Sequence, residues 1–177
     1  MWLTILIVLA VVVGALAVVV SMQPVDFKLS RSTTIAAPPA AVFAEVNDLH
    51  RWNAWSPWAK MDPNMKMTFD GPAAGEGSSQ SWTGNAKVGA GKMTITKSEA
   101  PSLVLLKLEF FKPFKATNQT EFTFKPEGQG TVVSWTMSGK NNFMAKAIHL
   151  VMNMDKVVGP QFEQGLTQLK ATAESKK

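Results

Sequence analysis

The stretch NFMAKAIHLVMNMDKVVGPQFEQGLTQLKATAE, residues 142–174, decides the fold because it is the only part after the N-terminal segment with sustained helical periodicity. Its apolar residues recur every three or four positions and form one stripe of a helix. The stripe consists of Met144, Ile148, Val151, Met152, Val158, Phe162, Leu166 and Leu169. Asp155 can cap a new helical start, which places Pro160 just beyond the first turn, where a missing N–H costs little. We predict a short helix to about Asn153, a break, and a long helix with one face to bury.

The chain before this stretch alternates between apolar and polar side chains, which is typical of strands with one buried face. Gly89 and Gly91 lie within one predicted strand, where glycine marks a bend or a close approach. Leu103–Phe111 is the most apolar strand and is therefore predicted to lie at the centre of the sheet. We predict seven strands, at about residues 25–35, 65–69, 78–83, 88–97, 103–111, 117–125 and 131–138. The fold class is α+β, with the sheet as the partner of the C-terminal helix.

The N-terminal segment Trp2–Val20 is an almost unbroken apolar run. At about 1.5 Å per residue it is long enough to cross a hydrocarbon core of about 30 Å. A cleaved signal peptide is the alternative, but the run is longer than a usual signal core and no Lys or Arg precedes it. We predict that residues 1–22 are a transmembrane anchor and residues 23–177 a separate domain. Lys28 and Arg31 follow the run, which favours the cytoplasmic side and leaves an extracytoplasmic location open.

Composition narrows the class of protein. The chain is 46% apolar and 18% charged, which is normal for one domain with a buried core. Its net charge of +5 comes from scattered lysines that do not form a track for nucleic acid, and we expect a monomer. Without cysteine there is neither a disulfide nor thiolate chemistry. His50 and His149 show no paired spacing, so we predict no metal site and no cofactor.

Four motifs resemble one known family. They are IAAPPAAVFAEVNDLHRWNAWSPW at 35–58, GAGKM at 89–93, GTVVSWTM at 130–137 and MDKVVGPQFEQGL at 154–166. They look like the START-like (SRPBCC) superfamily, the polyketide cyclase/dehydrase and lipid-transport group, and in particular its membrane-anchored bacterial members. The resemblance covers almost everything after Val25. It implies a helix-grip fold, in which a curved antiparallel sheet wraps the long C-terminal helix and leaves an apolar cavity between them.

Large, soft apolar side chains exceed what a small core needs, and methionine adapts to varied shapes. Each alone is consistent with an ordinary core position. As a group, within the implied fold, we predict that they line a ligand cavity. The candidates are Trp52, Trp55, Trp58, Trp82, Met93, Phe110, Trp135, Met137, Phe143, Met144, Ile148, Met152 and Phe162.

Three classes of function are consistent with these residues. The leading hypothesis is a membrane-anchored, non-enzymatic domain that binds a hydrophobic small molecule or lipid. The second is a cyclase-like or hydrolase-like enzyme, which needs an acid–base pair at the cavity; Asp48, His50 and Glu109 are the candidates. The third is a protein-interaction module like the heat-shock ATPase activator homologues of the superfamily. A blocked cavity with an exposed apolar patch would favour this third class.

The domain boundary can be tested by truncation. Deletion of residues 1–22 should leave a soluble, folded domain, because the alternation that starts the sheet begins only at Val25. Near-ultraviolet circular dichroism of the truncated protein checks this. Aggregation, or loss of the near-ultraviolet signal, would mean that the N-terminal segment is part of the fold.

Overall fold

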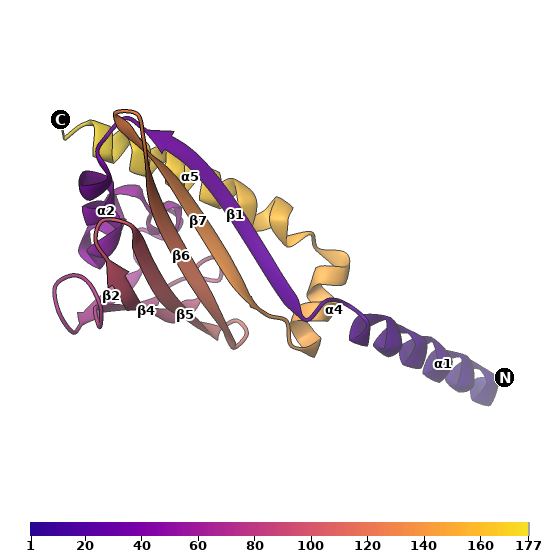
Figure 1. Cartoon of the computed structure of the whole chain (residues 1–177). Helices are drawn as coiled ribbons and strands as arrows, with labels where there is room; N and C mark the ends of the chain where they lie inside the picture. Colours follow the sequence, from indigo (N-terminus) through magenta and orange to yellow (C-terminus); the bar gives the residue numbers. More distant parts are fainter. Residues whose placement is uncertain (177) are drawn as a thin grey trace.

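The computed structural model describes residues 1–176, which contain one seven-stranded antiparallel sheet with strand order β1-β7-β6-β5-β4-β3-β2 (Figure 1). The strands are β1 (Asp26–Ile35), β2 (Lys66–Asp70), β3 (Ser79–Thr83), β4 (Ala90–Glu99), β5 (Leu103–Lys112), β6 (Ala116–Glu127) and β7 (Gly130–Lys140). The predicted number of strands is confirmed, and the apolar β5 lies at the centre. β1 pairs with β7, so the first and last strands of the chain are neighbours. β1 forms the edge of the sheet beside the C-terminal helix.

The long C-terminal helix packs on the concave face of this sheet, so the predicted helix-grip fold is confirmed. The helices are α1 (Trp2–Ser21), α2 (Pro39–Asn47), α3 (Trp52–Trp55), α4 (Phe143–Val151) and α5 (Met154–Glu174), with single turns η1 (Leu49–Arg51) and η2 (Pro57–Lys60). α1 projects away from the rest of the chain (Figure 1). α2, α3 and α5 contribute the helical side chains of the apolar core that the sheet encloses.

The break in the C-terminal stretch lies between α4 and α5, as predicted, but its cap is a different residue. The Asn153 side chain accepts a hydrogen bond from the Lys156 backbone N–H at 3.1 Å and starts α5. Asp155, the predicted cap, lies in the first turn, where its charge favours the helix N-terminus. Asn153 has the extended backbone that a cap requires, and Asp155 is already helical.

Arg31 of β1 holds α5 against the edge of the sheet. Its Nε donates to Glu163 Oε1 at 2.7 Å, and its Nη2 donates to Asp155 Oδ1 at 2.9 Å. These hydrogen bonds, first the one to Glu163 and then the one to Asp155, raise the pKa of Arg31. Gly159 lies under the guanidinium, where a Cβ would collide with Nη2. A larger residue at position 159 would therefore displace the Arg31 guanidinium from its place over the helix.

Trp135 of β7 is the central contact between sheet and helix. Its ring is stacked between Phe122 and Phe162, with centroid distances of 4.8 Å and 4.1 Å, and is 2% exposed. Gly165 of α5 faces this ring, and a Cβ there would lie 2.7 Å from Trp135 Cζ3. The helix therefore approaches the sheet as closely as its backbone permits.

At the far side of the sheet, β4 and β3 curl inward. Gly91 lies directly against the Trp82 ring, and a Cβ there would collide with that ring. The pairing of β4 with β5 shifts register between Ala90 and Gly91 and again between Ile95 and Lys97. Such irregularities increase the bend of a strand, as Gly91 predicted. Gly89, predicted within the same strand, lies just before β4.

Gly165→Ala tests the closeness of helix and sheet. In a helix interior this change usually stabilises by about 0.5–1 kcal/mol. Here the added methyl overpacks the Trp135 ring, which its two neighbours hold in place, so we expect a net destabilisation of about 1–3 kcal/mol. Denaturant unfolding of the full chain in detergent, followed by circular dichroism, measures the free energy. The adjacent exposed Gln164→Ala is the control and should change it by less than about 0.5 kcal/mol. A stabilised Gly165→Ala variant would contradict the packing described.

Candidate ligand-binding cavity

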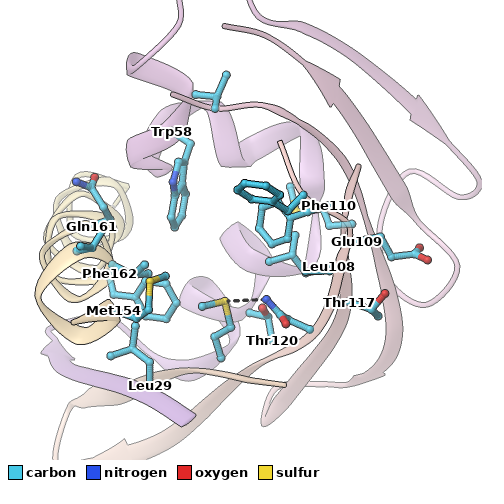
Figure 2. Close-up of a pocket in the computed structure, with 18 of the residues that line it drawn as sticks. Leu29, Trp58, Leu108, Glu109, Phe110, Thr117, Thr120, Met154, Gln161 and Phe162 are labelled. Atoms are coloured by element: carbon cyan, nitrogen blue, oxygen red, sulfur yellow. Dashed lines mark hydrogen bonds between the residues drawn. The ribbon is translucent and has the colours of Figure 1, made fainter. Parts of the chain in front are cut away.

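A cavity of about 1250 Å³ lies between α5 and the concave face of the sheet. Figure 2 shows Phe110 and Leu108 of β5 on one side of it and Phe162 of α5 on the other, with Trp58 of η2 between these walls. Leu108 and Trp58 are only partly buried although they pack against the core, because they face this open space. The volume exceeds the roughly 300–1,000 Å³ of ordinary small-molecule pockets.

Ten of the thirteen predicted lining residues surround this cavity. They come from α3, η2, the four strands β3, β4, β5 and β7, and both C-terminal helices, so elements distant in sequence border one cavity. The ten are Trp52, Trp58, Trp82, Met93, Phe110, Trp135, Met137, Met144, Ile148 and Phe162.

The other three predicted residues do not line it. Trp55 is fully buried in the core, where its Nε1 donates to the Glu45 carbonyl at 3.1 Å. Phe143 and Met152 are 57% and 46% exposed, at the start of α4 and in the break before α5. The break turns Met152 off the helical stripe that the sequence suggested, and Phe143 lies on the outer side of α4.

Many lining residues were missed, and several of them are methionine or leucine. Seven of the ten methionines line the cavity: Met61, Met65, Met67, Met93, Met137, Met144 and Met154. The alternation of Met65, Met67 and Phe69 indicated which face of β2 is apolar. It did not indicate how far that face lies from α5. Leu106 and Leu108 had the same signal in β5, since alternate residues of a strand share a face.

The three acid–base candidates do not meet at the cavity. Figure 2 shows the Glu109 carboxylate directed away from the space, and this carboxylate pairs with Lys107 at 2.7 Å. Asp48 and His50 pair with each other at 3.1 Å, and neither lines the cavity. His149 of α4 does line it, and its ring meets Phe27 edge-on with the centroids 6.0 Å apart. The walls thus offer apolar contact far more than acid–base chemistry.

A curved sheet that grips a long helix above an apolar cavity defines a helix-grip, START-like domain. Residues 26–174 match the family model described as polyketide cyclase / dehydrase and lipid transport, and the chain belongs to this family.

Solved structures of low sequence identity share the fold. Protein CV1439 from Chromobacterium violaceum is 16% identical, with a TM-score of 0.59 over 86% of this chain and 99% of that one. The Aha1 dimer from Colwellia psychrerythraea is 16% identical, with a TM-score of 0.60 over 84% of this chain and 96% of that one. No curated protein sequence matches the chain. At these identities the similarity shows the shared fold and does not assign a function to this chain.

A pair of tryptophan substitutions tests the shape of the cavity. Ile148→Trp adds bulk where α4 faces open space, so we expect the melting temperature to stay within a few degrees and binding of a fluorescent fatty acid to weaken. Met152→Trp is the control, because Met152 lies outside the cavity, and should leave probe binding unchanged. Thermal denaturation and probe titration of both variants check this. Equal effects of the two variants on probe binding would contradict the assigned lining.

Proposed function

We propose that residues 23–177 bind a hydrophobic small molecule or lipid in the cavity between the sheet and α5, and that α1 anchors this domain in a membrane. The observation that carries the proposal is the cavity itself, about 1250 Å³ of open space bordered mainly by apolar side chains. Protein interiors are normally packed without such voids. The family to which the chain belongs, described as polyketide cyclase / dehydrase and lipid transport, supports the same class of ligand.

The chemistry of the walls favours a flexible, largely apolar ligand. Transfer of an alkyl chain from water to such a surface gains about 0.8 kcal/mol for each buried methylene. The seven lining methionines have flexible, polarisable side chains that repack around different shapes. Met-rich surfaces of this kind are typical of binders that accept several related ligands. We therefore expect selectivity for chain length and bulk more than for one headgroup.

Two observations support α1 as an anchor. It is a helix of 20 residues with a mean hydropathy of 3.2, and nearly all its side chains are exposed. Its last turn also contacts the domain: Val20 is 4% exposed, and Lys146 Nζ of α4 donates to the Ser21 carbonyl at 2.9 Å. A cleaved signal sequence shares the length and the composition, but contacts between α1 and α4 favour a segment that stays attached.

Tryptophan at Leu108 tests ligand binding directly. Leu108 points into the cavity from β5 (Figure 2), so Leu108→Trp should occupy ligand space and weaken fluorescent fatty acid binding by about tenfold or more, which is about 1.4 kcal/mol. Leu105→Trp, on the opposite face of the same strand, is the matched control and should bind as the wild type does. Fluorescence titration of the full chain in detergent measures both affinities. Unchanged binding in Leu108→Trp, or no binding by the wild type, would contradict the proposal.

A further inference from the structure

The exposed large apolar side chains outside α1 are not scattered over the domain. Within residues 1–176 they occur in the linker after α1, at the β5–β6 turn, in α4 and in the adjoining start of α5. They are Met22, Val25, Phe111, Phe114, Phe143, Met144, Leu150, Val151, Met152 and Val157. A water-facing surface has no reason to gather such side chains at particular elements.

Strand register shows that these elements share one end of the sheet. Asp26 at the start of β1 pairs with Lys140 at the end of β7, and Asn118 near the start of β6 pairs with Gly139. Phe110, near the end of β5, pairs with Ala116. The β5–β6 turn, the β7–α4 connection and the exit of α1 therefore all lie at the same end. The β6–β7 turn lies at the opposite end.

α4 has an unusual composition for a helix in water. Seven of its nine residues, FMAKAIHLV, are apolar, with Lys146 and His149 as the exceptions, and none of its side chains is fully buried. A helix that is apolar on nearly all sides is expected in a core or in a membrane. Met144 and Ile148 of α4 border the cavity, while Phe143 at its start and Val151 at its end are 57% and 81% exposed.

Charge at this end complements anionic lipid. Five exposed lysines surround the apolar residues, and within residues 1–176 none of them forms an ion pair: Lys28, Lys112, Lys115, Lys140 and Lys156. Of the nearby carboxylates, Asp155 is held by Arg31 and Asp26 remains exposed. Lysines close to a membrane surface are attracted to anionic lipid.

We propose that the exposed apolar residues of the β5–β6 turn, α4 and the start of α5 form a docking surface that inserts into the surface of a bilayer containing anionic lipid. The proposal rests on the membrane anchor of the proposed function and extends it to the domain itself. Because α4 contacts the last turn of α1, a bilayer around α1 comes within reach of α4. Phe111, Phe114, Met144 and Val157 are both exposed and part of the cavity wall, so docking opens the cavity towards lipid.

The absence of cysteine makes site-specific labelling straightforward. Single-cysteine variants of the full chain, labelled with an environment-sensitive fluorophore, are reconstituted into vesicles of phosphatidylcholine and phosphatidylglycerol with spin labels on the acyl chains. Val151→Cys and Phe114→Cys report the two parts of the docking surface. Val12→Cys reports insertion of α1, and Gln129→Cys, in the β6–β7 turn at the opposite end, is the control.

The docking surface predicts loss of fluorescence at both Val151 and Phe114, of the same order as at Val12, and none at Gln129. Quenching at Val12 with none at Val151 or at Phe114 would overturn the docking surface while leaving the anchor intact. Quenching at neither Val12 nor the docking positions would overturn both. Disulfide-linked dimers of the unlabelled Val151→Cys and Phe114→Cys variants after oxidation, together with no lipid quenching of the labelled ones, would show that a second copy covers these positions and would also overturn it. Fatty acid binding is measured separately with Leu108→Trp, so its outcome is independent of these results.

Discussion

The contact between Trp135 and α5 sets the separation of helix and sheet. Phe162 stacks on the indole at 4.1 Å, and Gly165 lets the helix backbone reach the ring edge. Beyond this contact, towards the end where α1 leaves, β4 bends near Gly91 and the helix breaks at Asn153. Trp135 fixes α5 to the sheet. Further towards the end where α1 leaves, α5 and the sheet are farther apart, and the cavity is the space between them.

This arrangement joins a fixed aromatic contact to adaptable side chains around one cavity. The residues of the sheet that fix α5, Arg31, Phe122 and Trp135, lie on β1, β6 and β7. The adaptable methionine and leucine side chains lie on β1, β2, β4, β5 and β7, in α4 and α5, and in the segment between η2 and β2. The lining can therefore change shape around a ligand while the aromatic contact that holds the helix remains in place. In the account proposed above, α1 and the docking surface then place the opening of this cavity at its source of hydrophobic molecules.

Periodicity predicted the fold because the spacing of apolar residues shows which face of each element is buried. Phe162, Leu166 and Leu169 recur at helical spacing, and Val133, Trp135 and Met137 alternate as in a strand. Spacing does not tell how far a face lies from its partner. Trp52 and Trp55 share one short helix, yet one borders the cavity and the other fills the core. Met152 fitted the helical stripe, but the cap at Asn153 interrupts it. Identifying the lining methionines of β2 and η2 required the sheet curvature, which depends on contacts between distant residues.

The central claim is that the space beside Trp135 takes up a hydrophobic chain. A fatty acid with a photoreactive diazirine at its chain end, bound to the full chain in detergent, irradiated and mapped by peptide mass spectrometry, tests this most directly. The account predicts crosslinks to inward residues of the sheet, such as Met93, Leu108 and Met137, that excess unlabelled fatty acid removes. Crosslinks confined to α1 and to exposed residues such as Val151, unaffected by competitor, would contradict it.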